Sequence, residues 1–161
     1  AMSFYYHEHE LQHVNRMVYD IKDFSKLPTV PTVARTLPTK DGKKIELLEL
    51  THICGTVLDK NKMKNSVSLL TPDGVVTVKI WKNQFAKYDK QISEIQPDGK
   101  KKVREKSWFS RGNLLYLQGV RRGDAFIPKA YKHSTHKVPI MKIIAVDGDK
   151  IVYTDKRYDE L

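Results

Sequence analysis

One short motif in the sequence has the spacing of a metal site. His9-Glu10-Leu11-Gln12-His13 matches H-E-x-x-H, in which two imidazoles four residues apart share a helix face and the glutamate activates a metal-bound water. Only eight residues precede the motif, and no later His or Glu stands out as a third ligand. We therefore expect a solvated helix face here and no metal site.

Other candidate chemical groups also have simpler explanations. Asp147 and Asp149 resemble the paired carboxylates that hold two metal ions for nucleotidyl transfer, but Gly148 between them predicts a hairpin tip. Cys54 is the single cysteine and lies in a predicted strand, which favours a small buried hydrophobic residue. The sequence thus predicts no catalytic residue and no cofactor, and we expect that this chain by itself is not an enzyme.

Positive charge is concentrated in one segment. The chain has 29 Lys and Arg against 19 Asp and Glu, and residues 100–137 hold 11 basic and 2 acidic residues, or +9 of the net +10. Aromatic residues lie among these cations. Single-stranded nucleic acid needs cations for its phosphates and flat apolar faces for its bases, so the pattern favours such a ligand. A basic loop beside ordinary core aromatics is the alternative.

Alternation along 75–81 places Trp81 beside Lys79, on the face opposite Val76 and Val78. A stacking role for Trp81 follows, and the alternative is that it closes the end of the core. The predicted nucleic-acid-binding residues are basic or aromatic: Lys79, Trp81, Phe85, Arg104, Trp108, Phe109, Arg111, Arg121, Arg122, Phe126, Lys129 and Lys132.

The N-terminal part predicts a helix and then a connector. Apolar residues at helical spacing predict an amphipathic helix over 4–24, within an N-terminal segment 1–26. Ala1-Met2 resembles a cloning junction, which predicts a fragment of a longer protein. Three prolines then predict an extended connector over 27–43. The apolar residues expected on the helix stripe are Leu11, Val14, Val18 and Ile21.

From residue 44 onward the pattern has a period of two residues. It predicts a long strand with a bulge or sharp bend at Gly55, a hairpin around a Pro-Asp-Gly turn, a short helix, a charged loop over 96–108 and three further strands. The predicted strands cover 44–60, 65–70, 75–81, 113–120, 138–146 and 150–153, and the helix covers 82–92.

These elements predict a mainly β fold. Five or six strands with a short helix after the third are typical of the oligonucleotide-binding (OB) β-barrel, which we expect over 44–157, followed by a tail at 158–161. The length of 161 residues suits one domain, and 40% hydrophobic residues exclude a disordered tail. The sequence shows no membrane span and no signal peptide, so we expect a cytoplasmic location and no membrane partner.

Two stretches carry a family resemblance: GTVLDKNKMKNSVSLLTPDGVVTVKIWKNQFAKYDKQIS (55–93) and KSWFSRGNLLYLQGVRRGDAFIPKAY (106–131). Together they resemble the OB domain near the C-terminus of bacterial and phage DNA polymerase III alpha subunits. SFYYHEHEL (3–11) is similar to the family's GFY…HPL element, with Glu10 replacing the usual proline. This resemblance accounts for His9 better than zinc does.

The resemblance implies a module that binds single-stranded template DNA, with the remainder of an alpha subunit and other replisome proteins as partners. The family's catalytic aspartates lie in a palm domain that this chain does not contain. Two alternatives stay open, an RNA-binding OB module and a barrel that serves as a protein-docking surface, because barrels of this shape host both uses.

Overall fold

The computed structural model describes residues 10–161, so His9 of the predicted metal motif lies outside the described residues. The helices are α1 (Arg16–Tyr19), η1 (Phe24–Lys26), α2 (Lys82–Asp89) and η2 (Tyr158–Glu160). The strands are β1 (Val33–Pro38), β2 (Lys44–Leu48), β3 (Thr51–Asn61), β4 (Ser66–Thr71), β5 (Gly74–Lys79), β6 (Ile92–Ile95), β7 (Lys101–Glu105), β8 (Leu114–Arg122), β9 (Ala125–Pro128), β10 (Ile140–Asp147) and β11 (Lys150–Thr154). No described helix is long and apolar enough to cross a membrane.

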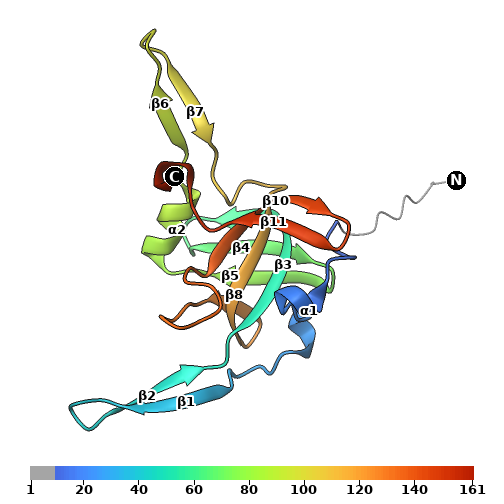
Figure 1. The fold of residues 1–161 in the computed structure, drawn as a ribbon, viewed down its shortest axis with the longest axis vertical. Coiled ribbons are helices and arrows are strands. Elements are labelled where there is room, and N and C mark those ends of the chain that lie inside the picture. Colours follow the sequence, from blue (N-terminus) through green and yellow to red (C-terminus); the bar gives the residue numbers. More distant parts are fainter. Residues whose placement is uncertain (1–9) are drawn as a thin grey trace, which may run out of the picture.

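Five of these strands close a barrel. β3 pairs antiparallel with β4 and β8, β4 pairs with β5, and β9 closes the ring by pairing parallel with β5 and antiparallel with β8. α2 lies between the third and fourth barrel strands, while β10 and β11 extend the sheet beside β8 (Figure 1). The predicted mainly β barrel is confirmed, and this arrangement fits an OB-type barrel.

The barrel interior is filled by apolar side chains from every barrel strand and from α2. In β5, Val76 and Val78 are buried while Thr77 and Lys79 are exposed, as the alternation predicts. Cys54 is buried as expected, and this burial raises the pKa of its thiol to about 12.

Two glycines let barrel strands approach each other closely. A Cβ at Gly119 would lie 2.0 Å from the Ile127 carbonyl oxygen, and one at Gly55 would lie 2.6 Å from the Leu70 carbonyl oxygen. The irregularity in the β3–β4 register falls between Val57 and Asp59 and not at Gly55. The predicted bulge at Gly55 therefore lies further along β3, and Gly55 itself provides room for the neighbouring strand.

The long N-terminal helix predicted over 4–24 is wrong for its described part. Only α1 forms: the Asn15 side chain accepts hydrogen bonds from the Met17 and Val18 N–H groups, and Asp20 takes a left-handed conformation that ends the helix. Val18, which the sequence pattern places on the apolar stripe, is exposed. The other stripe residues are buried under the β10–β11 end of the molecule: Leu11, Val14 and Ile21.

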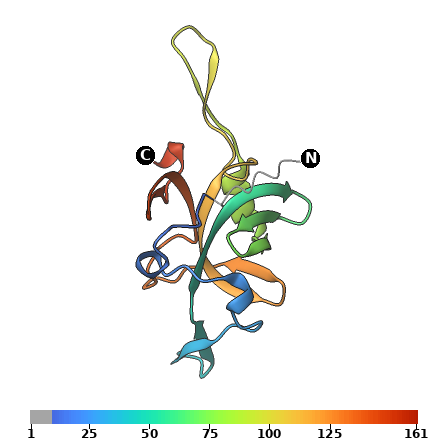
Figure 2. The same ribbon diagram turned by 90° about the vertical axis from the view of Figure 1, so that its right-hand side faces the viewer.

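Two hairpins form where the sequence predicted other structure. β1 and β2 pair with each other, so β1 lies in the predicted connector and β2 is separate from the barrel strand β3. β6 and β7 pair within and beside the predicted loop 96–108. Both hairpins project from the barrel, at opposite ends (Figures 1 and 2). Neither hairpin has a fully buried face, so most of their side chains are exposed or half-buried.

The predicted C-terminal tail begins directly after a buried arginine. Arg157 has 0% exposure, and its Nε donates to Glu105 Oε1 at 2.5 Å while its guanidinium lies 5.5 Å from the centre of the Trp108 ring. The other guanidinium N–H groups donate to the backbone carbonyls of Lys87, Tyr88, Lys90 and Lys106 at 2.7–3.2 Å. This one side chain joins the end of α2, the base of the β6–β7 hairpin and the C-terminus.

We expect Arg157→Ala to lower the free energy of unfolding by about 3–5 kcal/mol, because it leaves the Glu105 carboxylate and several carbonyls without their partner. Urea denaturation measures the change. Arg111→Ala, at an exposed arginine, is the matched control and should change stability by less than about 0.5 kcal/mol. Equal effects of the two substitutions would contradict the structural role of Arg157.

Candidate nucleic-acid interface

The outward face of β4 and β5 carries the best-exposed candidate residues. Ser66 pairs with Lys79 and Ser68 with Thr77, which gives this face small polar side chains. Trp81 follows β5 and is 74% exposed, so the alternative that it closes the core is wrong. Its carbonyl accepts a hydrogen bond from the Phe85 N–H at 2.8 Å, which starts α2 and fixes the backbone that carries the indole.

Three lysines lie on chain segments next to Trp81. The Ile80 N–H donates to the Asn65 carbonyl at 2.9 Å, which brings the β3–β4 loop with Lys64 to the end of β5. Lys82 is the first residue of α2. A shallow pocket of about 180 Å³ beside the indole is lined by Lys79, Ile80, Trp81 and Ile127. We call the exposed residues Lys64, Lys79, Trp81 and Lys82, together with the half-buried Ile127, the Trp81 surface.

The lysines of the Trp81 surface are available to a ligand. Lys64, Lys79 and Lys82 are exposed and form no ion pair with any residue in the described range 10–161. Arg122 extends the same face, because Thr77 of β5 pairs with Ala125 of β9, which in turn pairs with Arg122 of β8. The face therefore presents an aromatic ring with unneutralised positive charge around it, which is what stacked bases and phosphates require.

Four of the predicted stacking residues lie in the core. Phe85, Trp108, Phe109 and Phe126 are all buried, and their rings pack inside the barrel, with Phe85 and Phe109 centred 5.1 Å apart. The Trp108 Nε1–H also donates to Glu105 at 3.0 Å. Their assignment as base-stacking residues is corrected, since a barrel of this size needs large aromatic side chains to fill it.

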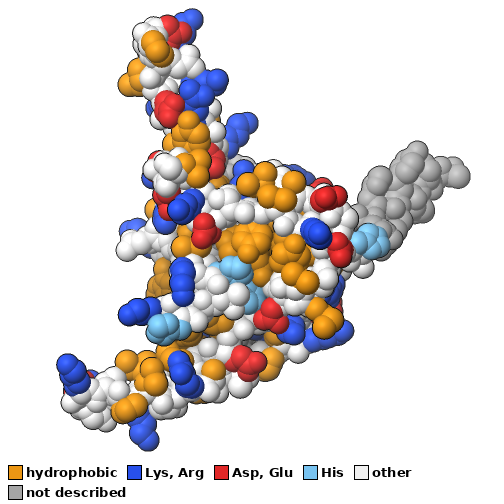
Figure 3. Space-filling model, in the orientation of Figure 1, with side chains coloured by type: hydrophobic (Ala, Val, Ile, Leu, Met, Phe, Trp, Pro, Cys, Tyr) orange, Lys and Arg blue, Asp and Glu red, His pale blue; other side chains and the backbone are white. Residues whose placement is uncertain are grey.

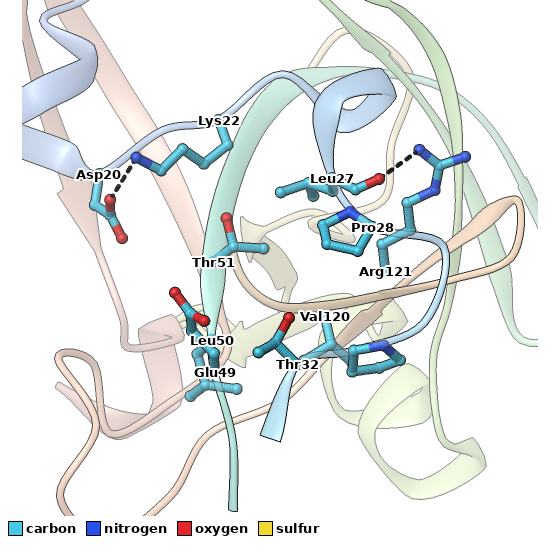
Figure 4. Close-up of a pocket in the computed structure, with 11 residues that line it drawn as sticks. Asp20, Lys22, Leu27, Pro28, Thr32, Glu49, Leu50, Thr51, Val120 and Arg121 are labelled. Atoms are coloured by element: carbon cyan, nitrogen blue, oxygen red, sulfur yellow. Dashed lines mark hydrogen bonds and ion pairs between the residues drawn. The ribbon is translucent and has the colours of Figure 1, made fainter. Parts of the chain in front are cut away.

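Arg121 is held by the N-terminal segment. Its guanidinium donates to the Phe24 and Leu27 carbonyls at 2.9 and 3.1 Å and lies 4.3 Å from the centre of the Phe24 ring. Figure 4 shows Arg121 at the wall of a pocket of about 290 Å³ that is also lined by Thr51 and Val120. Arg121 therefore holds η1 against the barrel. Because its guanidinium is engaged by these contacts, its prediction as a phosphate contact is corrected.

The remaining predicted cations are spread over the molecule. Arg104 lies on the β6–β7 hairpin and pairs with Glu94 at 2.8 Å, and the Lys129 ammonium lies 5.6 Å from the centre of the Tyr131 ring. Arg111 precedes β8, at the opposite end of that strand from Arg122. Lys132 lines a pocket of about 510 Å³ between the β1–β2 hairpin and the loop after β9. The basic segment 100–137 thus does not form one groove.

Sequence reasoning missed Lys64 and Lys82. Both lie outside the segment that holds most of the net charge, so a count by segment passed over them. The signal that could have found them is local: Lys82 adjoins the exposed Trp81, and Lys64 lies in the loop that leads into the strand paired with β5.

The two aspartates considered for metal chemistry lie on an exposed hairpin turn. Asp147 and Asp149 are exposed on the β10–β11 turn, where Gly148 has a φ of +61°. Within residues 10–161 no group of three or more His, Cys, Asp and Glu side chains could hold a metal ion.

The two tryptophans give a direct test of these placements. We expect Trp108→Ala to lower the free energy of unfolding by about 3–5 kcal/mol, since it empties part of the core. Trp81→Ala should change it by less than about 0.5 kcal/mol, because the indole is mostly exposed. Urea unfolding of the two variants under identical conditions measures the difference, and similar losses would place Trp81 in the core.

Comparison with known proteins points to polymerases. The chain is 48% identical over 149 residues to the protein named "Probable DNA polymerase YorL" of Bacillus subtilis (strain 168) and to a "DNA-directed DNA polymerase" of Bacillus phage SPbeta. The match covers 92% of this chain and 11% of each relative, so the chain spans about a tenth of their length. No family model and no solved structure matches the chain. This barrel is therefore similar to a segment of DNA polymerases.

Proposed function

We propose that this chain is a single-stranded-DNA-binding module of a replicative DNA polymerase alpha subunit of the polymerase III type. The observation that carries the proposal is the Trp81 surface, an indole with 74% exposure beside lysines that have no partner among the described residues. Similarity to DNA polymerases supports the polymerase context, and the closed barrel with its exposed β4–β5 face supports the strand-binding role.

In this proposal Trp81 stacks against an unpaired base while Lys64, Lys79 and Lys82 neutralise the phosphates on either side of it. The serine side chains on β4 are small and do not protrude from the sheet, so the DNA strand can lie across it. The module itself performs no chemistry. It holds unpaired template for the remainder of the alpha subunit, next to other replisome proteins in the cytoplasm.

The first test is the loss of stacking. We expect Trp81→Ala to weaken binding of a labelled single-stranded DNA by about 1–3 kcal/mol, or roughly 5- to 150-fold, in fluorescence anisotropy. Trp81→Phe keeps an aromatic face and should retain most of the affinity. Val152→Ala, at an exposed apolar residue of β11 away from the β4–β5 face, is the control and should have little effect. Unchanged affinity of the Trp81→Ala variant would contradict the proposal.

The second test is the salt dependence. Contacts from Lys64, Lys79, Lys82 and Arg122 should give a slope of log affinity against log salt near about −3, at roughly −0.7 per phosphate on a single strand. Replacing the three lysines by alanine should reduce the slope to about −1. A slope that the triple substitution leaves unchanged would place the strand elsewhere, and tighter binding of the same sequence as RNA would favour an RNA-binding module.

A further inference from the structure

The β6–β7 hairpin is a two-stranded ribbon that projects from the barrel. We call residues Ile92–Glu105 the ribbon. Its tip is closed by the Gln96 N–H, which donates to the Lys100 carbonyl at 2.8 Å, and by Gly99 with a φ of +81°. Two views at right angles show the ribbon extending away from the rest of the molecule (Figures 1 and 2). Almost all of its side chains are therefore accessible.

The base of the ribbon is firmly held. Ile92 is buried at the start of β6, and Glu105 at the end of β7 accepts hydrogen bonds from Arg157 and from the Trp108 indole. A buried ion pair at this position fixes the direction in which the two strands leave the barrel. The ribbon is thus held in position by its base, unlike a free loop.

Charge is distributed unevenly between the two faces of the ribbon. Lys102 lies opposite Glu94 in the register of the two strands, and Arg104 forms an ion pair with the same glutamate. These two cations therefore share one face of the ribbon with Lys100 at the tip. Lys100 and Lys102 form no ion pair with any residue that the structure describes. Blue Lys and Arg side chains are visible along the projecting ribbon in Figure 3.

The opposite face of the ribbon is partly apolar. Ile95 pairs with Lys101 across the two strands, and Val103 lies further along on the same face. Ile95 is 80% exposed and Val103 is 43% exposed, so this face offers apolar side chains to a ligand. A ligand that contacts both faces of the ribbon would accept cations on one face and meet apolar side chains on the other.

We propose that the ribbon binds double-stranded DNA by lying in the major groove. That groove is about 12 Å wide and 8.5 Å deep, which admits a two-stranded β-ribbon. With the Ile95 face turned to the floor of the groove, the thymine methyl groups there suit its apolar side chains. Lys100 and Lys102, on the other face, then lie level with the phosphates along the groove edges, which their long side chains can reach. The ribbon and the Trp81 surface involve different residues, so this duplex contact stands or fails independently of the proposed single-strand function.

The test uses the whole chain, a labelled DNA duplex of about 20 base pairs, and the variant Lys100→Ala/Lys102→Ala. We expect affinity for the duplex to fall at least about tenfold and the salt slope to become less steep by about 2, since each phosphate contact contributes roughly 0.9. Binding to single-stranded DNA should stay unchanged. Both substitutions are at exposed positions, so the variant should remain folded, which circular dichroism verifies.

The matched control is Lys40→Ala/Lys43→Ala, which removes the same charge from the tip of the other hairpin, β1–β2. It should leave duplex binding nearly unchanged. A duplex of the same sequence made of RNA distinguishes groove binding from general charge attraction, because its major groove is too narrow and deep to be entered. There the ribbon variant and the unsubstituted chain should bind equally.

Three results would overturn the proposal. The first is an equal loss of duplex affinity in the control and the ribbon variant, and the second is an equal loss on DNA and RNA duplexes. The third is unchanged DNA duplex binding in the ribbon variant, which would leave a protein as the ligand of the ribbon.

Discussion

The buried ion pair between Arg157 and Glu105 connects parts of the molecule that the barrel alone would not hold together. Burying two charges is costly, and here the cost is offset by carbonyls at the end of α2 that accept the remaining guanidinium N–H groups. These carbonyls carry the negative end of the helix dipole, so a cation at this position is favoured twice. The C-terminal residues thus take part in positioning α2 and the ribbon.

Close packing inside the barrel decides which aromatic residues remain for a ligand. Gly55 and Gly119 bring strands near enough that the interior is narrow, yet it still needs large rings, and Trp108 is among those that fill it. Trp81 stays outside the core because it lies two residues beyond β5, at the point where the chain turns into α2. The exposure of Trp81 follows from its position after the end of a strand. Phe85, four residues later in α2, instead packs against Phe109 in the core.

The sequence predicted the parts of the fold that have a repeating buried face. The β4–β5 hairpin around its Pro-Asp-Gly turn, the short helix α2 and the outward position of Trp81 follow from alternation and turn residues. It predicted β2 only as the start of the barrel strand, and it did not predict its partner β1 or the hairpin of β6 and β7, because strands without a buried face leave a weak apolar pattern. It also could not separate Trp108 from Trp81, since burial of a single aromatic residue depends on contacts between residues distant in the sequence.

One helix connects the two surfaces proposed here. α2 starts at Trp81, whose carbonyl accepts the first helical hydrogen bond, and ends at carbonyls bound by Arg157, which also holds Glu105 at the base of the ribbon. Eight residues at 1.5 Å each make this helix about 12 Å long. A helix so short and held at both ends keeps the stacking surface and the ribbon in a fixed relation. Such a relation suits a DNA molecule whose single strand continues from a duplex, because the two parts of that ligand are themselves joined at a fixed distance.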